Sequence, residues 1–165
     1  MDCTFKEVET EDLPLLADIL NYYILNTTVT FHKEPLQASD MAEKVFFTQP
    51  HYQSFSIVTA NKVIGYCAVS QWKKQEAYRH TAEINIYLHS DYTGKGIGHI
   101  AVRHLEEFAK RNDIQNLIAG LCSENMTSRR LFEKSGYHHC ATFQKVGDKF
   151  GRNLDVVYLQ KLLSD

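Results

Sequence analysis

Three closely spaced glycines stand where a predicted strand gives way to a predicted helix, and their spacing suits them to hold an anion. The segment reads Thr93-Gly94-Lys95-Gly96-Ile97-Gly98, and the helix is expected to begin at His99. Glycines let backbone N–H groups face an anion, and the helix dipole favours negative charge at the same end. We therefore predict a phosphate-binding loop, to which the N–H of His99 adds a donor.

Two familiar phosphate-binding motifs do not match this loop. Walker A requires Ser or Thr directly after a Gly-Lys pair, whereas Gly96 follows Gly94-Lys95. The dinucleotide fingerprint G-x-G-x-x-G also fails, because the glycines run G-x-G-x-G and no acidic ribose partner is evident about 20 residues later. Taken alone, the glycines leave open a tight turn that binds nothing, since a short glycine loop is weak evidence.

Two motifs together resemble the GNAT acetyltransferase superfamily. The glycine loop is similar to that family's acetyl-CoA loop, Gln/Arg-x-x-Gly-x-Gly/Ala, with Thr93 in place of the usual Gln or Arg. The segment Asn125–Tyr137 (NMTSRRLFEKSGY) is similar to the family's Asn-x-x-Ser/Ala-x-x-Leu-Tyr/Phe-x-Lys-x-Gly-Phe/Tyr segment. Two motifs in this order, on the expected elements, are much more specific than either alone.

Four further segments resemble the phosphinothricin N-acetyltransferase branch of that family. They are Asn26–Phe31 (NTTVTF), Trp72-Lys73, Ala77-Tyr78-Arg79 and Lys149–Val156 (KFGRNLDV). The resemblance implies a GNAT fold, a mixed α/β fold in which about four helices flank a mostly antiparallel, splayed sheet. It also implies a homodimer that transfers acetyl from acetyl-CoA, by direct attack in a ternary complex. The acceptor would be the primary amine of a small amino-acid-like molecule such as phosphinothricin, methionine sulfone or methionine sulfoximine.

Acetyl transfer to an amine requires a base, because an α-amine is largely protonated near neutral pH. Glu83 is the candidate. It precedes the glycine loop on a strand that the resemblance places against both substrates, where related enzymes carry a glutamate. Burial against Tyr87 or Tyr66 would raise its pKa towards useful basicity. The alternative is a solvated strand glutamate.

The resemblance also assigns the cofactor site beyond the loop. The backbone of Ile86, Tyr87 and Leu88 is expected to grip the pantetheine arm, and an N–H near Tyr87 or Leu88 to hold the thioester oxygen. Asn125 is expected to hydrogen-bond the pantetheine amides, and Ser128 to let its helix approach closely. The alternatives for these two residues are a helix cap and a surface hydroxyl.

The chain departs from the family at two positions. Phe132 stands where many GNAT enzymes carry a Tyr that protonates the leaving thiolate, so Tyr137 or a water is the candidate acid. A thiolate is a tolerable leaving group, which makes the acid less necessary. Leu154 replaces a His of phosphinothricin enzymes, and this bears on the identity of the acceptor more than on acetyl transfer.

Acceptor recognition is expected to use a cation and several aromatic side chains. Arg79 or Arg152 would hold the carboxylate of an amino-acid-like acceptor in a planar guanidinium fork. The aromatic side chains of Phe31, Tyr78 and Trp72 would pack around the acceptor's side chain. The alternative for each of these five residues is a plain surface or core position.

Composition, net charge and residue spacing argue against several other classes of function. The 165 residues are expected to form one GNAT domain over 1–165, with no linker, repeat or low-complexity tract. A net charge of −2 argues against nucleic acid, no apolar run approaches the roughly 20 residues of a membrane span, and the acidic N-terminal stretch is not a signal peptide. Four scattered cysteines and eight histidines lack metal-ligand spacing. We therefore expect no metal, reduced core thiols and a cytoplasmic location.

The hydrophobic pattern places these residues on alternating elements. Thr10 and Ser39 would cap two early helices, with a loop and a short strand over Asn26–Pro35 between them. The later strands are predicted at Phe55–Ala60, Val63–Ser70, Ala82–Leu88, Leu117–Cys122, Tyr137–Val146 and Asn153–Leu162, the first two joined by a hairpin at Asn61-Lys62. The later helices are predicted at His99–Arg111, with Ile100, Leu105, Phe108 and Ala109 as its apolar stripe, and at Thr127–Ser135, which Gly136 would end.

Other functions stay open at this point. A protein or peptide amine acetyltransferase would share the cofactor site and present a long, open acceptor groove. A non-catalytic acyl-CoA-binding module is compatible with Phe132 and Leu154, whereas Glu83 argues against it. An interaction protein without any cofactor is disfavoured by the intact glycine loop.

Overall fold

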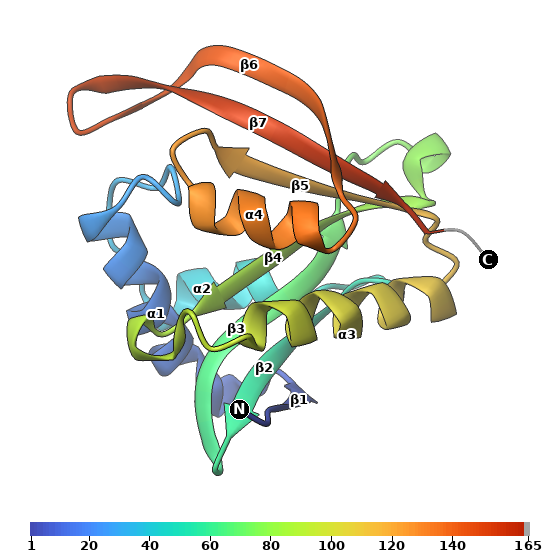
Figure 1. The fold of residues 1–165 in the computed structure, drawn as a ribbon. Coiled ribbons are helices and arrows are strands. Elements are labelled where there is room, and N and C mark those ends of the chain that lie inside the picture. Colours follow the sequence, from blue (N-terminus) through green and yellow to red (C-terminus); the bar gives the residue numbers. More distant parts are fainter. Residues whose placement is uncertain (164–165) are drawn as a thin grey trace.

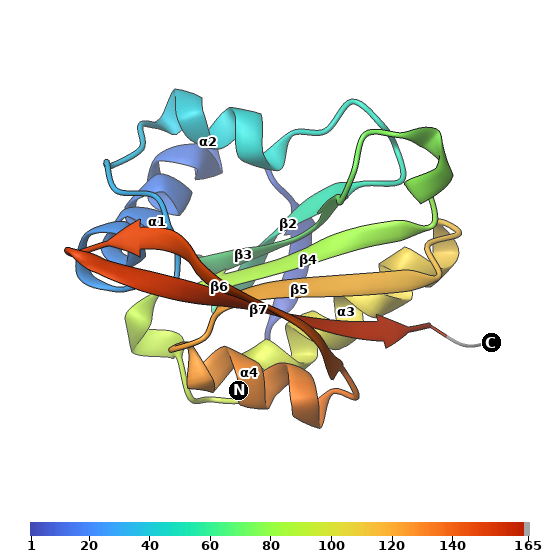
Figure 2. The same cartoon turned by 90° about the horizontal axis from the view of Figure 1, so that it is seen from above.

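A seven-stranded sheet with helices on both faces makes up the fold (Figures 1 and 2). The computed structural model describes residues 1–163. In chain order the helices and strands are β1 Thr4–Glu7, α1 Leu13–Asn26, α2 Ala38–Val45, β2 Gln53–Thr59, β3 Lys62–Gln71, β4 Thr81–Leu88, α3 Ile97–Arg111, β5 Asn116–Cys122, α4 Met126–Lys134, β6 His138–Lys149 and β7 Arg152–Leu162. The strand order is β1-β2-β3-β4-β5-β7-β6, and only the β4–β5 pair is parallel. The expected mixed α/β fold is confirmed.

Each face of the sheet is covered by its own pair of helices, α1 with α2 and α3 with α4 (Figure 2). Leu16 and Leu20 of α1 and Met41 of α2 pack against Tyr66 in one apolar cluster. The other face buries an α3 stripe with strand residues such as Ile57. Burial of each such side chain contributes about 1.5–3 kcal/mol of transfer free energy. No helix within residues 1–163 is long and apolar enough to cross a membrane.

The strands β4 and β5 pair only at their first residues. Thr81, Ala82 and Glu83 face 116–118 of β5, and the pairing ends there. Beyond that point β4 stays paired with β3 as far as Leu88, while β5 pairs with β7 along its whole length. The facing edges of β4 and β5 therefore diverge, as Figure 1 shows. The sheet opens into a wedge, which is the splay that the resemblance implies.

The two faces of β4 carry different side chains, as period-2 alternation predicts. Ile84, Ile86 and Leu88 pack with the α3 cluster, whereas Tyr87 packs with the α1–α2 cluster. Glu83 has the same parity as Tyr87 and lies on its face. The candidate base and the helix α3 are thus on opposite sides of the sheet.

The predicted helix starts are wrong in their capping residues. Glu9, not Thr10, begins the first helical turn, in a reciprocal capping box with Asp12. Gln37, not Ser39, begins α2, in a box with Asp40. In both cases the carboxylate three residues later accepts a hydrogen bond from the backbone amide of the capping residue. A capping box satisfies more backbone donors than a lone hydroxyl does.

Several strand predictions also need correction. β1 was not predicted, and no strand forms within 26–35. The β2–β3 turn is Ala60-Asn61, because both residues have positive φ (46° and 61°) as a tight turn requires. β6 continues through Gly147 to Lys149, since irregular register between Phe143 and Gly147 lets the strand absorb the glycine.

Two expected core residues lie at the surface instead. Ile100 is 37% exposed, because Ala101 and Val102 take the buried side of α3. Cys140 is exposed on β6 and Cys3 is half-buried, whereas Cys67 and Cys122 are core residues as expected. All four thiols are free.

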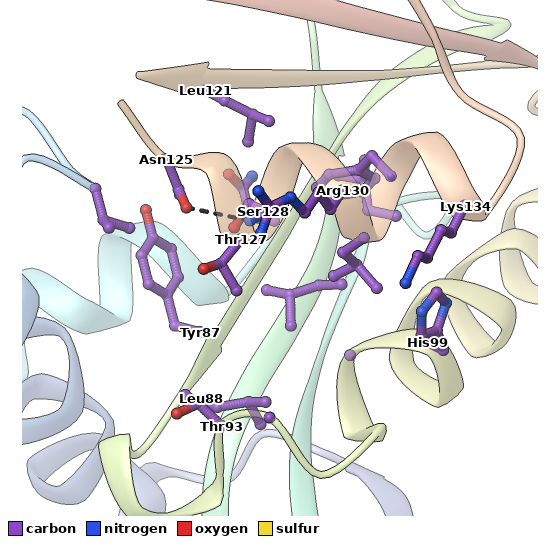
Figure 3. A pocket seen from close by; sticks show the side chains of 18 of the residues that line it. Tyr87, Leu88, Thr93, His99, Leu121, Asn125, Thr127, Ser128, Arg130 and Lys134 are labelled. Atoms are coloured by element: carbon purple, nitrogen blue, oxygen red, sulfur yellow. Dashed lines mark hydrogen bonds between the residues drawn. The ribbon is translucent and has the colours of Figure 1, made fainter. Parts of the chain in front are cut away.

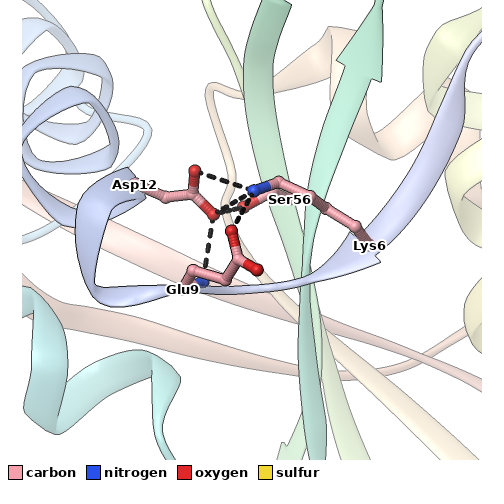
Figure 4. A network of polar contacts seen from close by, with 4 residues as sticks. All are labelled: Lys6, Glu9, Asp12 and Ser56. Atoms are coloured by element: carbon pink, nitrogen blue, oxygen red, sulfur yellow. Dashed lines mark hydrogen bonds and ion pairs between the residues drawn. The ribbon is translucent and has the colours of Figure 1, made fainter. Parts of the chain in front are cut away.

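A buried carboxylate joins the first helical turn to the sheet (Figure 4). Asp12 accepts hydrogen bonds from the Glu9 amide at 3.0 Å, from Ser56 Oγ at 2.8 Å and from Lys6 Nζ at 3.1 Å. Burial raises the pKa of the Asp12 carboxyl, but these hydrogen bonds outweigh burial and hold the pKa below its usual value. The carboxylate form therefore stabilises the fold.

We expect Asp12→Asn to lower the free energy of unfolding by about 1–3 kcal/mol at neutral pH, because a buried charged acceptor is lost. A depressed folded-state pKa stabilises above the unfolded pKa and stops doing so as pH falls through the folded value. The deficit of the variant should therefore shrink below about pH 4. Urea unfolding of the unsubstituted protein and of Asp12→Asn at several pH values measures this difference in unfolding free energy. Glu11→Gln, which changes an exposed neighbouring carboxylate, is the control. A deficit that does not change with pH would contradict the assignment.

Candidate active site

A cleft of about 600 Å³ occupies the wedge between β4 and β5 (Figure 3). It gathers residues that are far apart in sequence, from the end of β4, the glycine loop and the start of α4. Ten of the twelve predicted cofactor residues line it, namely Ile86, Tyr87, Leu88, Thr93, Gly94, Gly96, Gly98, His99, Asn125 and Ser128. Ile97 is instead buried in the core, and Lys95 lies over the Tyr92 ring, its Nζ 5.2 Å from the centroid.

The glycine loop has the backbone that the sequence predicts. Gly94 and Gly96 have φ of 72° and 82°, a region that other residues rarely adopt, and a Cβ at either would meet open space. Gly96 is the N-cap of α3, so the first N–H groups of the helix have no intrahelical acceptor. The arrangement suits an anion beside the loop.

Gly98 allows α3 to pack closely against α4. A Cβ there would lie 2.9 Å from Leu131 Cδ2 of α4. The missing side chain lets α3 and α4 approach each other at the floor of the cleft. The hydroxyl of Thr93, the residue that departs from the family motif, donates to the Ser90 carbonyl at 2.9 Å. The loop therefore offers an anion mainly backbone donors.

Asn125 is the N-cap of α4. Its Oδ1 accepts from the Ser128 amide at 3.2 Å, so the predicted alternative of a helix cap is what the contacts show. The cap uses only the oxygen, and the side-chain NH₂ group keeps two donors beside the cleft. A single residue can thus cap the helix and present donors to a ligand.

Eleven of the 21 lining residues were not among the predicted site residues, and Arg130, Lys134, Tyr23 and Val29 are four of them. Arg130 and Lys134 lie one turn apart on α4, and Figure 3 shows Lys134 beside His99 at the start of α3. Tyr23 and Val29 close the other end of the cleft. The i, i+4 spacing of the two cations in the α4 motif was a usable signal. Nothing in the sequence pointed to Tyr23.

Glu83 lies on β4 at the last residue that pairs with β5, opposite Ser70 of β3. The side chain is half-buried, and burial raises the pKa of its carboxyl, while the charge of Lys73 partly opposes the shift. On the same face, the rings of Tyr66 and Tyr87 stack with centroids 5.4 Å apart. The carboxyl is thus more basic than an exposed glutamate at the point where the wedge opens.

Tyr137 is not brought into the cleft. Its side chain is 1% exposed and packs edge-on against Phe132, with centroids 5.1 Å apart. Burial raises the pKa of the phenol strongly, and the nearby carboxylate of Glu106 raises it further. Phe132, by contrast, lines the cleft. The aromatic side chain at the position of the family's tyrosine therefore has no proton to give.

None of the four predicted acceptor residues lines the cleft. Arg79 pairs with Asp113 at 3.3 Å, and Tyr78 packs edge-on against Trp72. Arg152 makes two hydrogen bonds to Glu124, of 2.9 and 3.1 Å. Phe31 packs on the backbone of β6 beside the cleft's open end. Leu154 is buried, 3% exposed. The predicted guanidinium forks are each engaged by a carboxylate of the protein itself.

No group of three or more His, Cys, Asp or Glu side chains suited to a metal ion occurs within residues 1–163. The cleft itself offers an anion-binding loop and strand backbone without a partner on the β5 side, whereas Glu83 is not among its lining residues and directly precedes them on β4.

Comparison with known proteins agrees with this geometry. The sequence model of the Acetyltransferase (GNAT) family matches residues 16–137. A phosphinothricin N-acetyltransferase of Streptomyces coelicolor is 28% identical over 93% of this chain and 92% of its own length. An L-methionine sulfoximine/L-methionine sulfone acetyltransferase of Pseudomonas aeruginosa is 28% identical over 97% and 94%.

Among solved structures, a GNAT superfamily phosphinothricin acetyltransferase of Sinorhizobium meliloti in complex with acetyl-CoA superposes with a TM-score of 0.93. It is 26% identical, and the match covers 99% of this chain and 90% of that one. Sequence and structure therefore agree over nearly the whole chain, and the protein belongs to the GNAT family as an N-acetyltransferase of the branch similar to phosphinothricin N-acetyltransferase.

Proposed function

We propose that this protein moves the acetyl group of acetyl-CoA to the primary amine of a small amino-acid-like acceptor, by direct attack in a ternary complex. The observation that carries the proposal is a cleft lined by an anion-binding glycine loop and by residues 84–88 of β4, the strand on which Glu83 directly precedes the lining residues. The names of the relatives support the acceptor class, since they act on phosphinothricin, methionine sulfoximine and methionine sulfone.

The lining residues fit acetyl-CoA. Gly94 and Gly96 leave open space where a side chain would stand, which lets a pyrophosphate approach the N–H groups of the loop. Residues 84–88 of β4 have no strand partner on the β5 side, so their backbone is free to hydrogen-bond the pantetheine amides. Asn125 adds its side-chain NH₂ group. Acetyl-CoA supplies an activated acetyl thioester.

Glu83 acts as the base in this proposal. Its carboxylate takes a proton from the acceptor ammonium, directly or through a water, and leaves a neutral nitrogen to attack the thioester carbon. A backbone N–H near Tyr87 or Leu88 holds the developing oxyanion. The carbon–sulfur bond then breaks, and the second proton that the nitrogen loses passes through water to the CoA thiolate, because Phe132 has no proton to give. The thiolate is a stable enough leaving group for this step.

The acceptor's carboxylate is best matched by Lys73. This cation is the charged side chain that opposes the pKa shift of Glu83, and its ammonium lies 5.4 Å from the centre of the Trp72 ring. An amino acid carries its amine and its carboxylate a few ångströms apart, which suits a base and a cation on the same side of the sheet. Lys73 therefore replaces Arg79 and Arg152 as our candidate.

We also propose a cytoplasmic homodimer built from this single domain. Four free cysteines favour a reducing compartment. Phe143 and Val146 are 52% and 59% exposed on the edge strand β6, an apolar strip of the kind that subunit contacts cover. Sedimentation of the purified protein gives the oligomeric state.

A first experiment tests the reaction and its base together. Thiol release from acetyl-CoA is measured with amino acids, phosphinothricin, methionine sulfone, methionine sulfoximine, polyamines and short peptides. We expect turnover on amino-acid-like amines and a loss of about tenfold or more in kcat with Glu83→Gln, since general-base assistance is worth at least that much. The acid limb of kcat/KM should lie above the usual pKa of a glutamate. Glu76→Gln, an exposed carboxylate near Tyr78, is the control.

The outcomes separate the alternatives. Turnover on peptides and not on amino acids would identify a peptide acetyltransferase. Tight binding of acetyl-CoA without turnover of any amine would identify a non-catalytic module. Failure to bind acetyl-CoA would contradict the assignment of the glycine loop.

A second experiment tests the nucleotide end of the cofactor site. Arg130 and Lys134 line the cleft, and Ser135 Oγ lies 3.3 Å from His99 Nδ1 between them and the loop. We expect Arg130→Ala and Lys134→Ala each to raise the KM for acetyl-CoA about threefold to tenfold at low salt and less at high salt, with kcat unchanged. Arg129→Ala removes a cation that pairs with Glu133 at 3.0 Å and should change nothing. Equal effects of all three would contradict a specific role.

A further inference from the structure

A buried ammonium that the proposed mechanism does not use lies beside the cleft. Lys149, the last residue of β6, is 1% exposed, and its Nζ donates to the Thr30 carbonyl at 2.7 Å. No carboxylate within residues 1–163 forms an ion pair with it. Burial without a counter-ion is unfavourable, so a lysine at such a place needs a reason other than stability.

The same loop contacts β6 at two neighbouring points. The ring of Phe31 lies on Gly147, where a Cβ would come within 2.3 Å of a ring carbon. Lys33 pairs with Asp148 at 2.7 Å, in the solvent. Thr30 and Phe31 of the loop thus contact Lys149 and Gly147 of the strand, and we call these two contacts the hairpin clamp; the exposed Lys33–Asp148 pair is not part of it.

The loop is also fixed where it leaves α1. Thr27 Oγ1 donates to the Tyr23 carbonyl at 2.7 Å and accepts from the Val29 amide at 3.2 Å. Between this anchor and the hairpin clamp, the chain has little freedom. Its backbone position is set from both ends, and the buried end depends on Lys149.

The other side of the loop forms part of the cleft. Val29 lines it, and so do Tyr23 and Tyr87. Thr30 lies beside the Tyr87 hydroxyl, and it moderates the rise in the pKa of Tyr87 that burial causes. Tyr87 is on the same face of β4 as Glu83. The loop therefore forms a wall at the end of the cleft where the acceptor must approach the base.

We propose that Lys149 is a positioning residue for the acceptor: its ammonium holds the Thr30 carbonyl, and so holds Val29 and Tyr87 as the wall against which the acceptor's amine is oriented. This inference rests on the proposed acetyl transfer, because the wall belongs to the same cleft. The hairpin clamp includes no residue of the glycine loop or of α4, and the 27–33 loop reaches that side through an exposed hydrogen bond from Thr28 Oγ1 to Glu124 Oε1 at 3.2 Å. Loosening the hairpin clamp weakens acceptor binding and leaves cofactor binding unchanged.

Two variants loosen the hairpin clamp by independent means. Lys149→Met keeps the length of the side chain and removes the hydrogen bond. Gly147→Ala keeps Lys149 and pushes a methyl group into the Phe31 ring. We expect each to raise the KM for the acceptor about tenfold, with the KM for acetyl-CoA changed less than about twofold. Lys33→Met, which breaks only the exposed contact of the same loop, should leave both values within about twofold.

Amide hydrogen exchange gives a readout that does not depend on turnover. Residues 27–33 should exchange about tenfold faster in Lys149→Met and Gly147→Ala, while the glycine loop and α4 exchange as before. A general loss of stability would instead speed exchange throughout the sheet. If one of the two variants fails to fold, the other is sufficient to test the role of the hairpin clamp.

Two results would overturn the inference. If Lys149→Met and Gly147→Ala keep the acceptor KM of the unsubstituted protein, the loop does not position the acceptor, and the acetyl transfer stands. The inference is also overturned if the KM for the acceptor and the KM for acetyl-CoA rise by the same factor in these variants. If the unsubstituted protein releases no CoA with any amine, the proposed function and the role of Lys149 both fail.

Discussion

The loss of pairing between β4 and β5 after Glu83 is the constraint on which the rest of this structure depends. Each strand is held on its outer edge, β4 by β3 and β5 by β7, so the gap does not unravel either of them. The open edge of β4 lines the cleft, where water can hydrogen-bond backbone groups that have no strand partner. A ligand that carries amides of its own, as a pantetheine arm does, can replace that water and hydrogen-bond the same groups.

The divergence of β4 and β5 also places the N-termini of α3 and α4 beside the same cleft. Because β5 leaves β4, the helix that follows it starts at the mouth of the cleft, and Asn125 begins α4 within the same cleft as the glycine loop that begins α3. Two helix N-termini, each with a positive dipole end, converge on one site. They lie this close because Gly98 presents no Cβ to Leu131. The third glycine of the loop is thus a requirement of helix packing as much as of phosphate binding.

Ten residues predicted to bind the cofactor line the cleft, and none of the four predicted to bind the acceptor does, for a physical reason. The glycine loop, β4 and the α4 motif are local patterns. The proposed acceptor side instead draws on the loop at 27–33, the β3–β4 connection and the β6–β7 hairpin, which are far apart in the sequence. Arg79 and Arg152 looked available because Asp113 and Glu124 are remote in sequence. The wrong caps Thr10 and Ser39 have a different, local origin, because in both cases a carboxylate three residues beyond the actual cap determined where the helix begins.

Charge pairing at the acceptor end has a consequence for catalysis. Exposed ion pairs are worth at most about 1 kcal/mol, so position, more than pairing, keeps Arg79 and Arg152 out of the cleft. Lys73 differs because its charge acts on Glu83 and lowers the pKa that burial raises. In the proposed ternary complex an acceptor carboxylate at Lys73 offsets that charge, while the acceptor's ammonium brings a positive charge to Glu83 until its proton is transferred. The burial of Glu83 is therefore the influence that keeps the carboxyl basic in the free protein and in the proposed complex.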